Sequence, residues 1–131
     1  RISPVFQENR LLERMDAVSN LRLVNPALTR EEARSALEAL GLRQGAQPVA
    51  EYSGGMKRRV SLLRALLCPG ELLVMDEPFK GLDGDTRGMT IAYTKKSLRG
   101  RTLLMVTHDP QEAELLQARV MRLPLLGEAD G

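Results

Sequence analysis

The sequence lacks tryptophan and has few other aromatic residues, with two tyrosines and two phenylalanines among 131 residues. Proteins that bind single-stranded nucleic acid usually stack the bases on aromatic side chains. The net charge of +2 is also too small for the basic patch of a nucleic-acid-binding protein. We therefore expect no nucleic-acid partner.

Cysteine and long apolar runs are scarce as well. The single cysteine, Cys68, has no partner for an internal disulfide. We expect it to pack as a small apolar side chain in a reducing, cytoplasmic setting. No apolar run approaches the roughly 18 residues of a membrane span. The chain opens on Arg1 rather than Met, which suggests a fragment or a processed form.

What the sequence does contain is an ordered set of features within residues 52–83, YSGGMKRRVSLLRALLCPGELLVMDEPFKGLD. A Ser-Gly-Gly turn at Ser53–Gly55 precedes a basic amphipathic stretch. An apolar segment, Leu72–Met75, then runs directly into two carboxylates, Asp76 and Glu77. Four apolar residues in a row are typical of a parallel strand buried on both faces. The pattern therefore predicts an α/β fold with a parallel sheet.

Asp76 and Glu77 are expected at the sheet edge where ligands bind, beyond the carboxyl ends of the strands. Neighbouring carboxylates repel each other unless a cation lies near them. Mg²⁺ bound to phosphates takes only one or two carboxylates and keeps several waters. Asp76 is thus predicted to serve the ion and Glu77 to orient an attacking water. The alternative is a pair of capping residues on a surface loop.

The Ser53-Gly54-Gly55 turn suits a phosphate. A helix N-terminus carries free N–H groups and partial positive charge, and glycines let a phosphate approach the backbone. Alternatively, Ser53 only caps the helix and the glycines permit the turn; both interpretations can hold together.

The helix that follows this turn has an apolar stripe that predicts a core-facing side. Its remaining positions are basic, and we interpret them as a solvated face rather than as phosphate contacts. The stripe comprises Met56, Val60, Leu63 and Leu67, and the basic positions are Lys57, Arg58, Arg59 and Arg64.

A second apolar segment, Thr102–Val106, is also predicted to be a fully buried strand. It delivers Thr107, His108 and Asp109 to the same sheet edge. A lone histidine is more often structural, but its position after a buried strand favours a role at the site. His108 could hold a γ-phosphate and the attacking water together. Pro110 then suits the first turn of a further helix.

Together these motifs resemble those of ABC-type ATPases and follow the order found in that family. They are the signature motif, the Walker B strand, the D-loop and the switch histidine, with the Q-loop before them near the start of the chain. The matching residues are Ser53–Met56 with Arg59-Val60 and Arg64–Leu66, then Leu72–Glu77, Gly81–Asp83, Thr107–Asp109 and Val5–Glu8. Asn9–Leu12 is similar to importer ATPases for nitrate, sulfonate and taurine-like anions. Tyr52 departs from the usual leucine and Arg58 from the common glutamine.

The resemblance implies a partial P-loop NTPase fold, with a parallel sheet and an inserted small helical subdomain that meets a transmembrane permease subunit. It implies ATP and Mg²⁺ as cofactors. It also implies a second ATPase domain paired head to tail, so that the signature motif of one domain closes over ATP held by the other. By this resemblance Glu77 and His108 are catalytic, Ser53, Gly54, Gly55, Gln7 and Asp83 bind the nucleotide, and Asp76 and Gln7 serve the metal.

We assign residues 1–131 to the C-terminal portion of one ABC ATPase domain. Within it, 13–50 form the helical subdomain and linker, 51–123 run from the signature to the switch region, and 124–131 form a tail. Helices are expected at 14–24, at 84–98 and from Thr29. The last of these carries the capping-box pair Thr29 and Glu32, the apolar face Ala33, Ala36, Leu37 and Leu40, and the terminating Gly41. A last strand is expected at 119–123.

The function expected is that of an ATP-binding and ATP-hydrolysing subunit of an ABC membrane transporter, more an importer than an exporter. It would lie on the cytoplasmic face of the cell membrane and serve a periplasmic or extracellular substrate-binding protein indirectly. No Gly-rich loop ending in Gly-Lys-Ser/Thr occurs in these residues, although the family places one before the Q-loop. That loop makes most contacts to the β- and γ-phosphates. We therefore predict that the chain alone neither binds ATP tightly nor hydrolyses it, and that an exposed sheet edge favours instability or oligomerisation.

Other classes share parts of this pattern. A DNA-repair or chromosome ATPase inserts long coiled coils, whereas the segment between Gln7 and Ser53 is short and lacks sustained heptads. A hydrolase using Ser53, Asp76 and His108 fails because Glu51 stands where the nucleophile elbow requires glycine. A non-catalytic dimerisation or docking module remains open.

Overall fold

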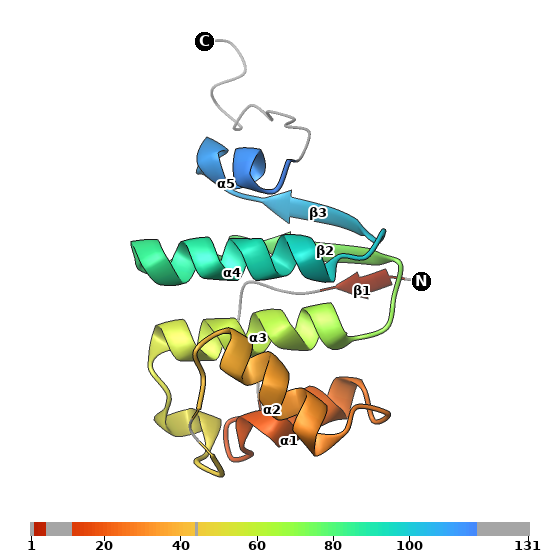
Figure 1. Cartoon of the computed structure of the whole chain (residues 1–131), viewed down its shortest axis with the longest axis vertical. Helices are drawn as coiled ribbons and strands as arrows, with labels where there is room; N and C mark the ends of the chain where they lie inside the picture. Colours follow the sequence, from red (N-terminus) through yellow and green to blue (C-terminus); the bar gives the residue numbers. More distant parts are fainter. Residues whose placement is uncertain (1, 5–11, 44, 118–131) are drawn as a thin grey trace, which may run out of the picture.

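A computed structural model describes residues 2–4, 12–43 and 45–117, and the statements below concern these residues (Figure 1). The predicted α/β architecture is confirmed: three parallel strands form one sheet in the order β1-β2-β3. The strands are β1 (Ile2–Pro4), β2 (Leu72–Asp76) and β3 (Thr102–Val106). The helices are α1 (Ala17–Val24), α2 (Arg30–Ala39), α3 (Gly54–Leu67), α4 (Gly84–Ser97) and α5 (Pro110–Leu115), with a 3₁₀ turn, η1, at Val49–Glu51.

The middle strand of the sheet is β2, which pairs with β1 on one side and β3 on the other. Leu72 lies opposite both Ile2 and Thr102, and Asp76 lies opposite Val106. Because both pairings are parallel, the residues that follow β2 and β3 emerge at the same sheet edge. This register places Glu77 next to the residues after Val106.

Only one face of the sheet is covered by the described helices. Leu73 and Met75 of β2 are fully buried in a cluster with side chains of α3 and α4. On the opposite face, Leu104 and Val106 of β3 are 59% and 54% exposed. Successive residues of a strand point to opposite faces, so one-sided helix packing buries only alternate positions. The prediction that these strands are buried on both faces is therefore wrong for the described residues.

The start of α1 differs from the predicted helix at 14–24. Asp16 is the N-cap, and its Oδ1 accepts the Ser19 N–H at 2.7 Å. The preceding turn is fixed by Asn20, a fully buried side chain that accepts the Leu12 N–H at 3.0 Å and donates to the carbonyl oxygens of Leu12 and Asp16. Residues 12–15 therefore form a turn rather than the first helical residues.

The capping box predicted for α2 is present. Thr29 Oγ1 accepts the Glu32 N–H at 3.0 Å, and the Glu32 carboxylate accepts the Thr29 N–H at 2.9 Å. These bonds lower the pKa of Glu32. Gly41 follows the helix with φ +76°, a left-handed conformation that suits glycine. The predicted apolar face of α2 is buried, namely Ala33, Ala36, Leu37 and Leu40.

The central helix, α3, lies between the sheet and the α1–α2 pair (Figure 1). The predicted stripe faces α1 and α2: Val60 and Leu63 are fully buried there. A second buried face, which the stripe did not predict, packs against β2 and α4 through Leu62, Ala65 and Leu66. The helix is therefore shared by two apolar clusters.

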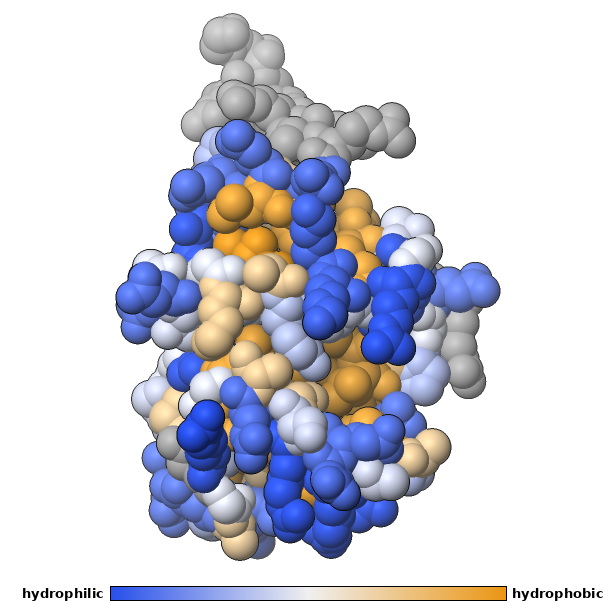
Figure 2. All heavy atoms as spheres, in the orientation of Figure 1, coloured by the Kyte–Doolittle hydropathy of each residue, from blue (hydrophilic) through white to orange (hydrophobic). Residues whose placement is uncertain are grey.

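The surface character differs between the two ends of the molecule. In the view of Figure 2, α1 and α2 present mostly hydrophilic side chains, and apolar side chains reach the surface around α4 and α5. Within the described residues, no helix has the length and apolar character needed to span a membrane. Gln7, the strand predicted at 119–123 and the tail at 124–131 lie outside the described residues.

Candidate functional site

The carboxylates after β2 lie beside the end of β3, as the parallel-sheet argument predicted. Asp76 is the last residue of β2 and is half-buried. Glu77 has a left-handed backbone, with φ +48°. Its N–H donates to the Val106 carbonyl oxygen at 2.8 Å. The chain thus turns sharply at Glu77 and leaves the sheet there.

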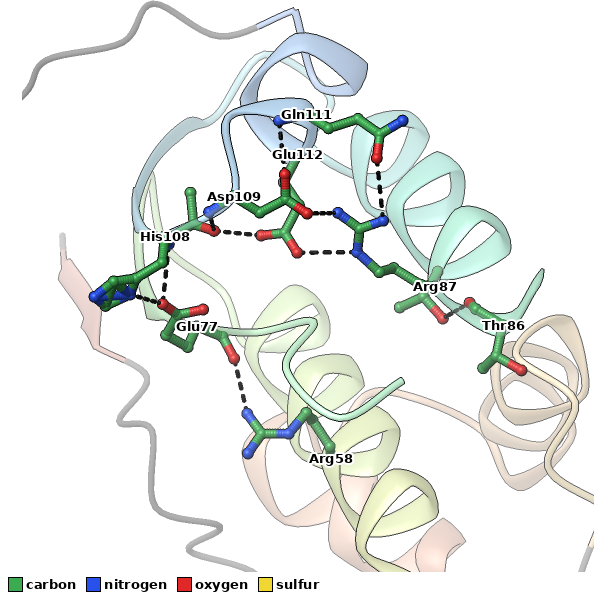
Figure 3. Close-up of polar contacts among 10 residues, drawn as sticks. Arg58, Glu77, Thr86, Arg87, His108, Asp109, Gln111 and Glu112 are labelled. Atoms are coloured by element: carbon green, nitrogen blue, oxygen red, sulfur yellow. Dashed lines mark hydrogen bonds and ion pairs between the residues drawn. The ribbon is translucent and has the colours of Figure 1, made fainter. Parts of the chain in front are cut away.

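Glu77 and His108 are in direct contact (Figure 3). Glu77 Oε1 accepts the His108 backbone N–H at 3.0 Å and lies 2.5 Å from His108 Nδ1. An ionised carboxylate only accepts, so Nδ1 carries a hydrogen in this contact and Nε2 faces away from it. The Glu77 side chain is 15% exposed, whereas the His108 side chain is 86% exposed. The geometry therefore gives an inner carboxylate and an outer imidazole.

Three basic residues of α3 make contacts to other parts of the fold, and Arg58 makes one with this corner of the molecule. Arg58 Nη1 donates to the Glu77 carbonyl oxygen at 2.8 Å. Arg59 donates to the Leu40 carbonyl oxygen at 2.7 Å, and burial lowers its pKa. Lys57 forms an ion pair with Glu13 at 3.0 Å. All three basic side chains are half-buried, so the interpretation of a solvated basic face is wrong for them.

The Ser-Gly-Gly turn opens α3 as a capped helix start. Ser53 is the N-cap, and its Oγ accepts the Met56 N–H at 3.2 Å. Ser53 and Gly54 are exposed. A Cβ added to Gly55 would lie 3.6 Å from Leu82 Cδ2, so the turn lies next to the segment before α4. The capping interpretation is thus present in the structure, and the N-terminus of α3 faces solvent, where an anion can reach it.

Asp83 caps α4 in the same manner. Its Oδ1 accepts the Thr86 N–H at 2.9 Å. This hydrogen bond lowers the pKa of Asp83, and Arg59 contributes to the lowering. Gly81, two residues earlier, has φ +83°, which shapes the turn that brings Leu82 to Gly55.

A charged cluster next to His108 was not predicted. Arg87 of α4 reaches across to α5, where it pairs with Asp109 and donates from Nε to Glu112 Oε2 at 3.1 Å (Figure 3). Glu112 is 4% exposed and also accepts the Thr107 hydroxyl at 2.5 Å. Thr107 and Asp109 flank His108, so the cluster fixes the backbone on both sides of it. Arg87 and Glu112 are 25 positions apart, and no local pattern marks them as partners.

The donor chemistry fits a magnesium ion that is held mainly by phosphates. Within 2–4, 12–43 and 45–117, no group of three or more His, Cys, Asp and Glu side chains could hold a metal by itself. Mg²⁺ in phosphate sites needs only one or two carboxylates, and the half-buried Asp76 at the end of β2 supplies one. The other predicted metal ligand, Gln7, lies outside the described residues.

A parallel sheet with a carboxylate and a histidine at neighbouring strand ends, and a glycine-opened helix beside it, fits the ATP-binding cassette class of α/β fold. The chain is similar to the dimeric, post-hydrolysis ATP-binding cassette MJ0796 bound to ADP and Pi, with a TM-score of 0.75 and 27% identity over 88% of this chain and 55% of that one. The sequence model of the ABC transporter family matches residues 1–80, and the chain belongs to this family. The resemblance read from the motifs is confirmed.

Curated relatives include importer ATP-binding proteins. The chain is 41% identical over 126 residues to the aliphatic sulfonates import ATP-binding protein SsuB 1 of Rhodococcus jostii, covering 91% of this chain and 49% of the relative. It is 40% identical over 121 residues to SsuB of Escherichia coli O1:K1 / APEC, covering 89% of this chain and 47% of the relative. The chain thus spans about half the length of the curated relatives it matches.

Proposed function

We propose that the chain forms the signature, Walker B, D-loop and switch part of the ATP-hydrolysing subunit of an ABC importer for sulfonate-like anions. The observation that carries the proposal is the contact between Glu77 and His108 at the ends of adjacent parallel strands. The relatives that are sulfonate import proteins support the substrate class.

Each residue at the strand ends has a proposed role. Glu77 accepts a hydrogen bond from the attacking water and orients it toward the γ-phosphate of ATP. With both ring nitrogens protonated, His108 donates its Nδ1–H to Glu77 and its Nε2–H to the γ-phosphate, and Glu77 holds that ring in place. Asp76 and Gln7 are the proposed Mg²⁺ ligands, and the ion supplies charge neutralisation at the phosphates.

The exposed N-terminus of α3 is proposed to act on a second copy's nucleotide. Ser53, Gly54 and Gly55 would contact the γ-phosphate of ATP held by that copy, and Asp83 would lie at the same junction. Free N–H groups and the helix dipole favour an anion at this point. The dimeric state of MJ0796 supports a pair of ATPase domains, for which we propose a head-to-tail arrangement.

The remaining partners follow from the same proposal. The α1–α2 pair would meet a transmembrane permease subunit, which would hold the protein at the cytoplasmic face of the cell membrane as a peripheral subunit. A periplasmic or extracellular substrate-binding protein would be reached only through the permease.

The proposal predicts a difference between the 131-residue chain and a longer one. Calorimetric titration of Mg-ATP into the chain should show no tight binding, and a phosphate-release assay no turnover, because these residues contain no Gly-Lys-Ser/Thr loop. A chimera in which the first half of the E. coli SsuB protein precedes these residues should bind and hydrolyse ATP. Glu77→Gln in the chimera should keep binding and stop turnover.

Micromolar binding by the short chain would overturn the account of the missing loop. A chimera that folds and dimerises but never hydrolyses ATP would refute the enzymatic proposal and favour a docking module.

A further inference from the structure

The backbone of Glu77 is held in an unusual conformation from two directions. Its φ of +48° is uncommon for a residue other than glycine. Such a conformation persists only where the surroundings determine it. On one side the Glu77 N–H donates to the Val106 carbonyl oxygen at 2.8 Å. On the other, the Glu77 carbonyl oxygen accepts from Arg58 Nη1, also at 2.8 Å.

The second of these contacts comes from a different layer of the fold. Val106 belongs to β3, the neighbouring strand, whereas Arg58 belongs to α3 and reaches the loop after β2 (Figure 3). Hydrogen bonds from a charged donor are stronger than neutral ones. Arg58 is half-buried, which reduces competition from water. The contact therefore ties α3 to the peptide group of Glu77.

We propose that Arg58 is a positioning residue for Glu77. By fixing the carbonyl group it holds the side chain of Glu77 where Oε1 meets the backbone N–H and Nδ1 of His108. Arg58 lies on the same helix as the Ser53–Gly55 turn, so the placement of the catalytic carboxylate depends on the position of that helix. This inference rests on the proposed function and adds a link between two of its sites.

The first test uses the chain as it is and needs no nucleotide. His108 is the only histidine in the sequence, so its imidazole resonances in NMR spectra are unambiguous. Arg58→Met should move these resonances, at fixed pH, in the direction seen in Glu77→Gln. It should also speed hydrogen exchange at the amides of Glu77 and His108 by roughly tenfold or more, the effect of losing a charge-assisted hydrogen bond.

Matched variants separate positioning from general damage. Arg58→Lys keeps a charged donor and should restore part of the exchange protection. Lys57→Met removes the neighbouring ion pair with Glu13 and should leave the His108 resonances unchanged. The proposal is overturned if Arg58→Met leaves His108 unchanged, or if exchange rises equally throughout α1 and α2.

The second test measures hydrolysis in the chimera described above. Arg58→Met should lower kcat by roughly tenfold or more while KM for Mg-ATP stays within about twofold, because the interaction matters for placing the attacking group rather than for binding. Arg58→Lys should recover part of kcat. A rise in KM at unchanged kcat would refute positioning. A wild-type chimera without turnover would refute the proposed function and, with it, the effect of Arg58 on hydrolysis, while the NMR result would still decide whether Arg58 holds Glu77.

Discussion

The contact between α4 and α5 includes one buried carboxylate, Glu112. It is 4% exposed, donates nothing when ionised, and accepts from both Arg87 and Thr107. Removing one partner of a buried ion pair generally costs about 3–5 kcal/mol. Arg87 keeps its contacts to Asp109 and Gln111 and has a side chain 20% exposed. We therefore expect Glu112→Ala to lower the free energy of unfolding by about 3 kcal/mol, the low end of that range.

Urea unfolding of a small set of variants measures this value. Glu112→Gln keeps an acceptor for Thr107 and should cost about 1–1.5 kcal/mol, the usual net worth of a hydrogen bond. A double-mutant cycle with Arg87→Met should give a coupling of about 1–2 kcal/mol between Arg87 and Glu112. Glu114→Ala, two residues along on the exposed side of α5, is the control and should stay within about 0.5 kcal/mol of wild type.

Two results would refute this reasoning. A loss below about 1 kcal/mol for Glu112→Ala would place it among ordinary surface substitutions. A coupling near zero would show that Arg87 and Glu112 stabilise the chain independently. Either result would remove the basis for saying that this cluster fixes the backbone around His108.

Four further predictions concern the sheet edge and the surface. Glu77→Gln in the chimera should lower turnover by about 10²–10⁴-fold, the range for loss of a general base, with calorimetric Mg-ATP affinity unchanged; a similar loss of affinity would contradict the assignment. Gly55→Ala should keep or raise the thermal midpoint, because its Cβ meets Leu82 only at 3.6 Å and alanine favours a helix by about 0.5–1 kcal/mol over glycine; in the chimera, the same substitution should lower ATP-dependent dimerisation in chromatography. Asp83→Asn should keep the helix cap and remove the pH dependence that Asp83 gives to the free energy of unfolding. The pKa of Asp83 is lowered on folding, so its ionised form stabilises the chain above the ordinary pKa of about 3.9, and wild type should lose that advantage in urea unfolding as the pH falls through the lower, folded value. Leu104→Ser should reduce self-association in sedimentation at little cost in stability, because that side chain is 59% exposed. Unchanged association would show that this face of the sheet does not mediate self-association.

Local chemistry was enough to predict the capped helices. Thr29 and Glu32 form the expected capping box, and Ser53 caps α3 as one of the two interpretations of its turn required. These signals involve residues three positions apart, so they are readable without knowing the fold. The same limit explains the wrong start of α1: the turn before it is fixed by Asn20, a contact across eight positions from Leu12.

The meeting of Glu77 and His108 was predictable because parallel strands bring their carboxyl ends to one edge. The contacts that support them were not. Arg58 reaches the Glu77 carbonyl from 19 positions away, and a run of basic residues carries no information about which carbonyl each one faces. Burial of the strands was overestimated for a related reason. An apolar strand sequence says that both faces can be covered, whereas the exposed Leu104 shows that the described helices cover one.

The two-sided packing of α3 restricts how this chain can change in length. One residue inserted into an α-helix turns everything beyond it by roughly 100° and shifts it by about 1.5 Å. Such an insertion after Gly55 would rotate Val60 and Leu62 away from their separate clusters and Arg58 away from the Glu77 carbonyl at once. In the loop before Pro48, a Cβ added to Gly45 would have no other atom within 4 Å. Insertions and deletions should therefore be tolerated near Gly45 and excluded from α3. The length of α3 thus fixes the spacing between the two apolar clusters and the position of Arg58 relative to Glu77.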